Sequence, residues 1–208
     1  MSTRRSLAQR LGVVAGFDDP LVDLEQYTTP PELAASIVHV ADLHEDIENQ
    51  TVIDLGSGTG MLALAAALRG PDRVIGVELD RDALSTAIKN RQRIATNTSV
   101  DWICADARNP PLSTKRSQTT VLMNPPFGAQ DGNEGADRSF LKTAKSLARV
   151  SYSVHNAGSQ EFVNAFVEEL GGEVTHEFAA ELDVDHQFAF HEKATKSIDA
   201  EVFRIVWG

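Results

Sequence analysis

The stretch TVIDLGSGTGMLALAAALRG, residues 51–70, decides the fold of this chain. Its β-branched beginning predicts a strand, and its alanine- and leucine-rich half, 61–70, predicts a helix. Between them, Gly56, Gly58 and Gly60 let the chain turn tightly and let a ligand approach the backbone. The spacing differs from the G-x-G-x-x-G that seats a dinucleotide pyrophosphate, and no P-loop lysine follows. The loop therefore favours a ligand without phosphates; the alternative is a strand–helix turn that binds nothing.

Strand and helix alternate on both sides of this stretch. The expected strands are 51–55, 73–79, 100–105, 119–124, 151–155, 173–182 and 199–207, and the expected helices are 31–43, 61–70, 80–97, 138–150 and 159–172. The last two strands follow one another with only a loop between them. This order predicts an α/β fold with a largely parallel sheet, helices on both faces and an antiparallel pair at the end. We expect one domain, 1–208, in which 1–45 is an N-terminal extension.

The composition is that of an ordinary globular protein. The chain has 208 residues, 42% of them hydrophobic, and this length buries enough surface to fold without disulfides or metal. Its single cysteine, Cys104, excludes an intramolecular disulfide and a cysteine-based zinc cluster within the chain. No stretch reaches the roughly 18 apolar residues of a membrane span, and the first residues lack the apolar run of a secretory signal. We therefore expect a soluble, cytoplasmic protein without a metal site.

The charge argues against generic nucleic-acid binding. Thirty acidic and 19 basic residues give a net charge of −11, which repels polyanions at long range. The distribution is uneven, because residues 17–50 hold nine acids and no lysine or arginine, whereas Arg4, Arg5 and Arg10 precede them without an acid. A nucleic acid could then be held only through local basic groups. The acidic surface suits a high-salt cytoplasm, or it is merely solvated.

Two acids follow the second and third expected strands. Glu78 lies 22 residues after Gly56, where an acid in a doubly wound sheet accepts hydrogen bonds from ribose hydroxyls. Asp106 follows the third strand, where its carboxylate could accept from an adenine amine. Ligands in such sheets bind beyond the carboxyl ends of the strands, so these acids and the glycine loop should converge. The alternative is that both acids are simply solvated.

The tetrapeptide Asn124-Pro125-Pro126-Phe127 ends the fourth strand at the same edge. Two prolines make the turn rigid and leave carbonyls free to accept hydrogen bonds. Asn124 adds a side-chain carbonyl, and Phe127 offers a face for a planar base or amide. This set can hold a planar NH₂ group whose lone pair points at a methyl sulfonium carbon, so that positioning supplies most of the acceleration. The alternative is a proline-terminated strand with a core phenylalanine.

Several runs occur together in order: LEQYTT (24–29), DIEN (46–49), NPPFG (124–128), FLKTA (140–144) and YSVH (152–155). From Leu24 to Trp207 the chain resembles the methyltransferase-like protein 5 family, which makes N6-methyladenosine in small-subunit ribosomal RNA. The resemblance implies a seven-stranded Rossmann-like class I methyltransferase sheet and the cofactor S-adenosyl-L-methionine. The implied cofactor site, with the whole glycine loop included, is Gln26, Thr29, Asp54, Gly56, Gly58, Thr59, Gly60, Met61, Glu78, Asp106 and Ala107. The implied catalytic residues are Asn124, Pro125, Pro126 and Phe127.

The chain departs from that family at three places. Its loop reads GSGTG where family members carry cysteines, and the ribose acid is Glu78 rather than aspartate; both changes keep the chemistry. The segment Phe190-His191-Glu192-Lys193 has an acid in place of one lysine, which affects how RNA is held. Phe127, Phe190, His191, Lys193 and Lys196 are the expected substrate contacts, unless the last four belong to an unexceptional exposed loop.

The family also implies a partner, a small zinc-binding activator protein that pairs with an edge strand. If VDWICA (100–105) is that edge, its unpaired backbone needs a cover; alternatively, Trp102 packs inward under a helix. Three other functions stay open: a glutamine methyltransferase of a release factor, although those usually read Asn-Pro-Pro-Tyr; a DNA N6-adenine methyltransferase, which should bring a recognition domain; and a non-catalytic scaffold.

Overall fold

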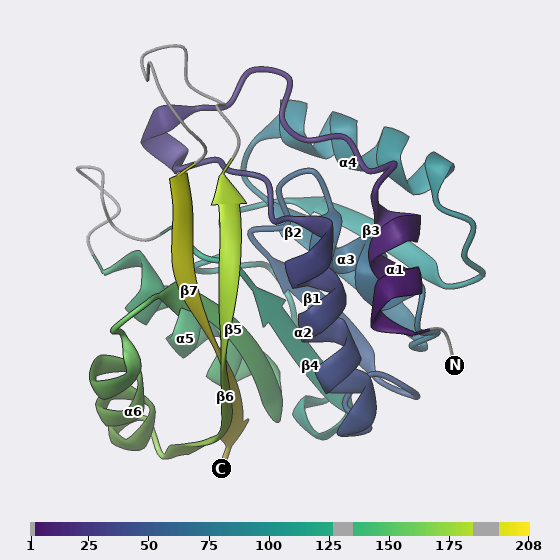
Figure 1. Ribbon diagram of the computed structural model, residues 1–208. Helices are drawn as coiled ribbons and strands as arrows, with labels where there is room; N and C mark the ends of the chain where they lie inside the picture. Colours follow the sequence, from purple (N-terminus) through teal and green to yellow (C-terminus); the bar gives the residue numbers. More distant parts are fainter. Residues whose placement is uncertain (1–2, 127–134, 185–195) are drawn as a thin grey trace.

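Seven strands form one sheet in the computed structural model, which describes residues 3–126, 135–184 and 196–208 (Figure 1). Their order across the sheet is β3-β2-β1-β4-β5-β7-β6. The strands are β1 (Thr51–Leu55), β2 (Arg73–Glu78), β3 (Ser99–Cys104), β4 (Thr119–Met123), β5 (Val150–Asn156), β6 (Gly172–Val184) and β7 (Lys196–Trp207). The first five are mutually parallel, β7 runs antiparallel to β5, and β6 runs antiparallel to β7. The predicted α/β class, with its terminal antiparallel pair, is confirmed.

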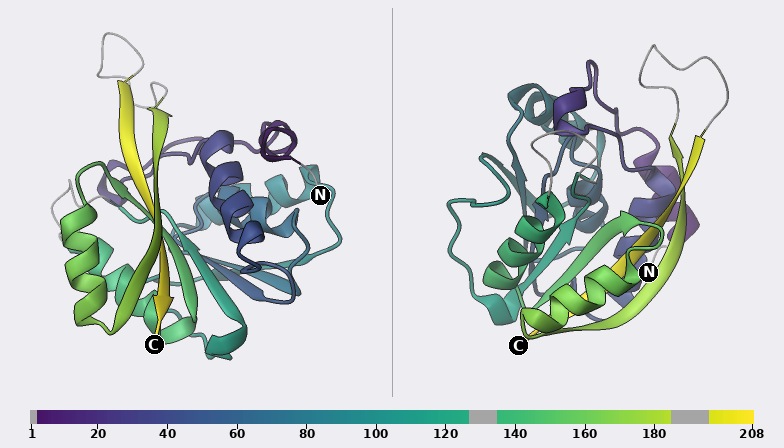
Figure 2. Two further views of the ribbon diagram at one scale, coloured as in Figure 1. Left: turned by 60° about the horizontal axis from the view of Figure 1, so that its bottom comes forward. Right: turned by 90° about the vertical axis from the view of Figure 1, so that its left-hand side faces the viewer.

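Helices cover both faces of this sheet. They are α1 (Arg4–Leu11), α2 (Pro31–Leu43), α3 (Met61–Ala67), α4 (Arg81–Arg93), α5 (Ala136–Leu147) and α6 (Gln160–Glu169), with short 3-10 turns at Val22–Leu24 and Arg116–Gln118. Helices α1 and α2 lie on the other face of the sheet from α5 and α6 (Figure 2). Side chains of α1, α2 and α3 contribute to one core cluster, and those of α5 and α6 contribute to the other. Because successive strand residues point to opposite faces, Val52 enters the first cluster and Ile53 the second. Burial on both faces explains the continuous apolar runs of the parallel strands.

Several predicted helix ends were wrong by a few residues. The helix expected over 61–70 stops at Ala67, and the one expected over 80–97 stops at Arg93, because Ile94 is already extended. The helix expected over 138–150 begins at Ala136 and stops before the extended Ala148, since β5 takes up its ladder at Val150. Asp80 caps α4, as its position indicates, by accepting a hydrogen bond from the Asp82 N–H. Helix α1 was not predicted.

The indole of Trp102 decides how the β3 edge of the sheet packs. Strand β3 is an edge strand, as expected, but Trp102 lies inward against the backbone of Gly60 and Gly76. A Cβ added at Gly60 would lie 2.7 Å from the indole, and one at Gly76 would overlap it. The inward alternative is therefore the correct one. The edge keeps its outer backbone, while its largest side chain fixes the glycine loop from below.

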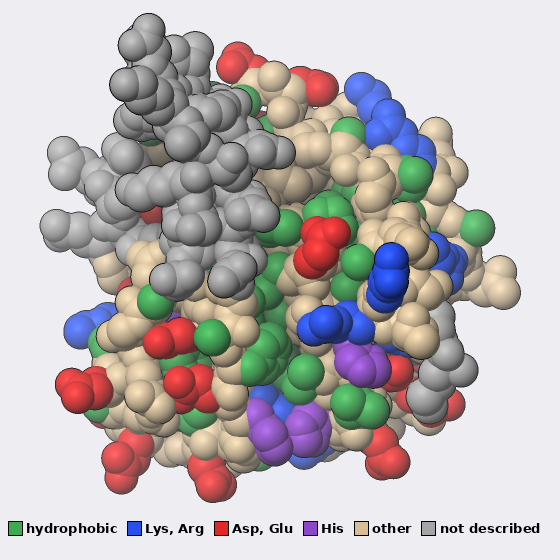
Figure 3. Space-filling model, in the orientation of Figure 1, with side chains coloured by type: hydrophobic (Ala, Val, Ile, Leu, Met, Phe, Trp, Pro, Cys, Tyr) green, Lys and Arg blue, Asp and Glu red, His purple; other side chains and the backbone are tan. Residues whose placement is uncertain are grey.

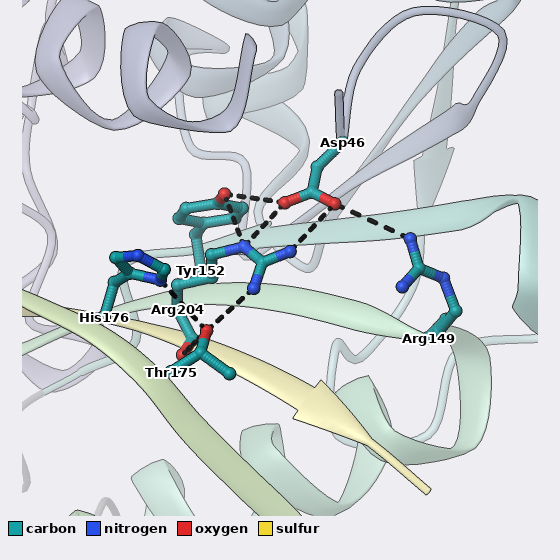
Figure 4. A network of polar contacts seen from close by, with 6 residues as sticks. All are labelled: Asp46, Arg149, Tyr152, Thr175, His176 and Arg204. Carbon is teal, nitrogen blue, oxygen red and sulfur yellow. Dashed lines mark hydrogen bonds and ion pairs between the residues drawn. The ribbon is translucent and has the colours of Figure 1, made fainter. Parts of the chain in front are cut away.

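A buried ion pair ties the segment between α2 and β1 to the antiparallel end of the sheet (Figure 4). The Asp46 carboxylate is 1% exposed and accepts from Arg204 Nε at 2.8 Å and from the Tyr152 hydroxyl at 2.8 Å. Arg204 also donates to Thr175 Oγ1 at 2.7 Å, and Arg149 approaches Asp46 at 3.6 Å. Every charge in this cluster has a partner, which is the condition under which a buried ion pair is tolerated.

Candidate functional site

A cavity of about 320 Å³ lies at the carboxyl ends of the parallel strands. The predicted residues that line it are Gln26, Thr29, Asp54, Gly56, Gly58, Thr59, Met61, Glu78, Asp106, Ala107, Asn124 and Pro126. Gly60 and Pro125 do not line it, while Phe127 lies outside the described residues. The structure thus brings the glycine loop, the two strand-end acids and the Asn-Pro-Pro turn together, as the parallel topology predicts.

The glycine loop needs its glycines for two reasons. Gly56, Gly58 and Gly60 have φ values of 71°, 52° and 91°, in the left-handed region that favours glycine. A Cβ on Gly58 would also lie 2.9 Å from the ring of Phe17, which lines the cavity. Phe140, from the core cluster of α5 and α6, would lie 3.2 Å from a Cβ on Gly56. Two aromatic rings therefore pack against the loop. Sequence reasoning had no signal for Phe17, and it placed Phe140 only in the FLKTA run.

Glu78 holds the loop as well as facing the cavity. Its Oε2 accepts from the Gly58 N–H at 2.7 Å, and its Oε1 accepts from the N–H groups of Leu79 and Asp80 at 2.8 and 2.9 Å. A carboxylate has about four lone-pair sites, so room is left chiefly on Oε2. Burial raises the pKa of the Glu78 carboxyl, while these backbone donors lower it. The geometry leaves Glu78 room for about one further donor, rather than the two hydroxyls expected from the sequence.

Asp54 is buried at the base of the cavity. It supplies the side-chain cap that the N-terminus of α3 lacks. Gly60 at the start of α3 offers no side chain, and Asp54 Oδ2 accepts the Ala63 N–H at 2.8 Å instead. Its Oδ1 and the nearby Ser57 Oγ are buried without a hydrogen-bond partner among the described residues. Burial raises the pKa of Asp54 to about 7. Both residues line the cavity, and unsatisfied buried oxygens beside a cavity fit a ligand that carries an ammonium or hydroxyl group.

Asp106 reaches the cavity already paired. Arg108 Nη2 lies 2.7 Å from its Oδ2, and Arg108 Nε donates to both oxygens. The hydrogen bonds and charge of Arg108 lower the pKa of the Asp106 carboxyl, so it is ionised. Sequence reasoning missed Arg108, which follows the acid by two residues. The pair is about half exposed, so Asp106 keeps access to a ligand while its carboxylate is held in one orientation.

The N-terminal extension forms one wall of the cavity. Gln26 Nε2 donates to Asp80 Oδ2 at 2.8 Å, and Gln26 Oε1 accepts from the Leu21 N–H at 2.8 Å. The bond to Asp80 links the extension to the N-cap of α4, whereas the bond from Leu21 is internal to the extension. The side chain of Gln26 is thereby used within the protein. These two bonds use one of the two donor hydrogens and one of the two acceptor sites of the amide, so Gln26 lines the cavity with capacity left for a ligand.

The side-chain amide of Asn124 is hydrogen-bonded to two residues of the same extension. Its Nδ2 donates to Thr29 Oγ1 at 3.0 Å, and its Oδ1 accepts from the Tyr27 hydroxyl at 3.0 Å. The Tyr27 hydroxyl also lies 3.3 Å from the Pro125 carbonyl oxygen. Burial and the charge of Glu25 raise the pKa of the Tyr27 phenol well above its usual value, so it is a donor at neutral pH. Tyr27 lies in the LEQYTT run, yet only its neighbours were assigned to the site.

The remaining predicted contacts are not placed by the structure. Phe190, His191 and Lys193 lie outside the described residues, and Lys196 begins β7 with a side chain that is not described. Within the described ranges, no group of three or more His, Cys, Asp or Glu side chains is placed to hold a metal ion. In the same part of the chain, no helix has both the length and the apolar character needed to cross a membrane.

Comparisons with known proteins agree on one family. The family model of the methyltransferase small domain matches residues 34–151. The rRNA N(6)-adenosine-methyltransferase Mettl5 of Drosophila melanogaster is 37% identical over 207 residues, 98% of this chain and 96% of that protein. An uncharacterized protein of Methanocaldococcus jannaschii is 36% identical over 99% of this chain and 94% of its own length. A candidate RNA methyltransferase from Pyrococcus horikoshii superposes with a TM-score of 0.87 at 34% identity, covering 100% of this chain and 98% of that one.

Proposed function

This chain belongs to the Mettl5 family of methyltransferase small-domain proteins, and we propose that it transfers a methyl group from S-adenosyl-L-methionine to N6 of an adenosine in small-subunit ribosomal RNA. One observation carries the proposal: a single cavity joins the unsatisfied Asp54 and Ser57 to the amide of Asn124. A donor with an ammonium group and an acceptor with a planar amine then meet in one place. The Drosophila relative carries this activity in its name, and the choice of the small subunit is our own extension.

Different cavity residues would bind different chemical groups of the cofactor. Asp54 Oδ1 and Ser57 Oγ would take its ammonium group, Glu78 Oε2 a ribose hydroxyl, and Asp106 the adenine amine, with the glycine loop and Met61 beneath. When bound, the cofactor supplies a methyl group activated by a sulfonium. No phosphate has to be neutralised, which agrees with a loop that carries no lysine. Several small-molecule contacts of this kind in one concave site are the usual pattern of a binding pocket.

The substrate amine would face the Asn-Pro-Pro turn. Asn124 Oδ1 and the Pro125 carbonyl accept its two hydrogens, and Phe127 would stack on the base, as such enzymes do with an extruded base. Holding the amine in line with the methyl group supplies the acceleration. A strong general base is not needed, because the amine becomes acidic as it gains positive charge. No histidine lines the cavity within the described ranges.

Few basic side chains are placed to bind the phosphates of RNA. The face in Figure 3 shows separated Lys and Arg side chains with acidic ones along its lower edge. A groove of about 1180 Å³ between α1, α2 and the β6–β7 hairpin is lined by Arg4, Arg5, His39 and Phe178, but also by Glu32 and Glu201. Arg10 is engaged with the Ala95 carbonyl at 2.7 Å. We assign RNA phosphate contacts to Arg4 and Arg5, together with the segment from Phe190 to Lys196.

We further propose that a small zinc-binding activator protein adds to the β3 edge. The support is that β3 ends the sheet and that Leu79 and Ile88 nearby are 51% and 48% exposed. Exposed edges invite a pairing strand. The free, exposed Cys104 suits a reducing compartment, so we place the protein in the cytoplasm. The chain expressed alone should be poorly soluble or inactive; a soluble, fully active monomer would contradict the partner.

Methyl transfer to purified small-subunit ribosomal RNA tests the proposed function. With labelled cofactor and the activator protein supplied, the wild type should label the RNA, and nucleoside digestion should return N6-methyladenosine. Asn124→Ala should lower kcat by about 10²–10³, the range seen when one hydrogen-bonding group that stabilises a transition state is removed. Asn97→Ala, remote from the cavity, is the matched control. Label in a release factor and not in RNA would instead identify a glutamine methyltransferase.

A further inference from the structure

The hydroxyl of Tyr27 stands where the proposed function needs a substrate amine. It lies 3.0 Å from Asn124 Oδ1 and 3.3 Å from the Pro125 carbonyl oxygen. Those oxygens are the two acceptors assigned above to the hydrogens of N6. A phenol has one hydrogen and so fully satisfies only one acceptor, whereas an unmethylated amine has two hydrogens and satisfies both.

The orientation of the Asn124 amide is fixed, so its Oδ1 is the acceptor for which the phenol and the substrate amine would compete. Its Nδ2 is held by Thr29 Oγ1 at 3.0 Å, which keeps Oδ1 directed toward Tyr27. Thr29 is 9% exposed, so water does not readily replace it. Two residues of one short segment therefore act differently on the same amide: Thr29 orients it, and Tyr27 occupies its acceptor.

We propose that Tyr27 is a positioning residue whose hydroxyl holds the amine position in the free enzyme and is displaced by the target adenine. The proposal rests on the proposed function. An incoming amine with two hydrogens gains one hydrogen bond over the phenol, but a group with one hydrogen gains none. The site then favours an unmethylated amine over a hydroxyl or an amine that already carries a methyl group.

The same competition acts on the product. As N6 forms its bond to the methyl carbon, the carbon–sulfur bond of the donor breaks, sulfur keeps the electron pair, and N6 releases one proton to solvent. The methylated amine keeps a single hydrogen. It has lost its advantage over Tyr27, whose hydroxyl can return to Asn124 Oδ1. Tyr27 thus aids release after one methylation.

A contact made only in the free enzyme opposes binding, because it must be broken first. Tyr27→Phe removes that contact. RNA should therefore bind about fivefold more tightly, the equivalent of one neutral hydrogen bond, although the free protein loses stability and its Tm falls by about 2–4 °C. Lower stability combined with tighter binding is a signature that a merely structural tyrosine does not produce.

The experiment measures binding of two RNAs to the full chain in the presence of S-adenosylhomocysteine. One is unmethylated small-subunit ribosomal RNA, and the other is the same RNA methylated to completion by the wild type. Both should bind Tyr27→Phe about fivefold more tightly than wild type. Thr29→Val, the matched variant on the other side of the amide, should slow methyl transfer without tightening either RNA.

Each outcome has a distinct meaning. Unchanged or weaker RNA binding by Tyr27→Phe, with a wild type that methylates adenine, overturns the role of Tyr27 and leaves the proposed function standing. A wild type that, supplied with the activator protein, places no methyl group on RNA overturns the proposed function and this inference together. Tighter binding of both RNAs by Thr29→Val as well would show a general loosening of the segment, and would also overturn the assignment to Tyr27.

Discussion

The two ends of the sheet carry polar clusters built from similar parts. At one end, the Tyr152 hydroxyl donates to Asp46, which also holds Arg204. At the other, the Tyr27 hydroxyl donates to Asn124, close to Asp54. In the Asp46 cluster every charge is paired inside the protein, whereas Asp54 Oδ1 and Ser57 Oγ lack partners among the described residues. A completed buried network serves the fold, and an incomplete one on a cavity wall serves a ligand.

The largest effect is expected at the completed cluster. Asp46→Asn leaves the Arg204 guanidinium, whose side chain is 11% exposed, without its anion. Removing one partner of a buried pair costs about 3–5 kcal/mol of unfolding free energy, to be measured by urea denaturation. Asp101→Asn is the matched control, because its pair with Arg73 is about half exposed and contributes less than about 1 kcal/mol. Equal losses from the two variants would contradict the comparison.

An intermediate effect is expected in the glycine loop, which belongs to the incomplete cluster. Gly58→Ala places a Cβ at a φ of 52° and 2.9 Å from Phe17. Backbone strain of this kind costs about 1–3 kcal/mol, and displacement of Phe17 should also weaken cofactor binding. Calorimetric titration with S-adenosylmethionine gives the affinity, and thermal unfolding gives the stability. Gly158→Ala is the control for strain alone, since its φ is 84° and nothing lies within 4 Å of the added carbon. Cofactor affinity that falls equally in both variants would refute a role for Phe17.

The smallest effect is expected in the pH dependence of cofactor binding, which depends on the ionisation of Asp54. Asp54 has its pKa raised to about 7 by burial, so its ionised fraction rises about tenfold between pH 6 and 8. If ionised Asp54 binds the ammonium of the cofactor, affinity should rise by about the same factor over that window. The free protein should respond oppositely: a carboxyl with a raised folded pKa destabilises it as pH climbs from about 4 toward 7.

Asp54→Asn is the test of that assignment. The variant should flatten both pH profiles, because the asparagine does not titrate. A cofactor affinity that still rises tenfold from pH 6 to 8 in Asp54→Asn would assign the titration to another group. Glu78, whose pKa is also raised by burial, would then be the next candidate on the same wall.

Much of the site could be predicted because parallel topology places strand ends together. Glu78, Asp106 and Asn124 follow strands of one sheet, so their convergence needed only the strand order. What could not be predicted is which of them arrive already bonded. Arg108 donates hydrogen bonds to the Asp106 carboxylate, and backbone N–H groups fill most of the acceptor sites of the Glu78 carboxylate. Such pairings depend on side-chain positions that spacing does not encode.

The sequence by itself determined the alternation of strand and helix, the glycine loop and the family, because local periodicity and motif order carry that information. Only the tertiary structure decided that Phe17 presses on Gly58, that Trp102 turns inward over Gly76, and that Tyr27 lies between Asn124 and Pro125. These contacts join residues far apart in the chain. They arise from how the N-terminal extension and the edge strand close onto the sheet, and no local pattern records that packing.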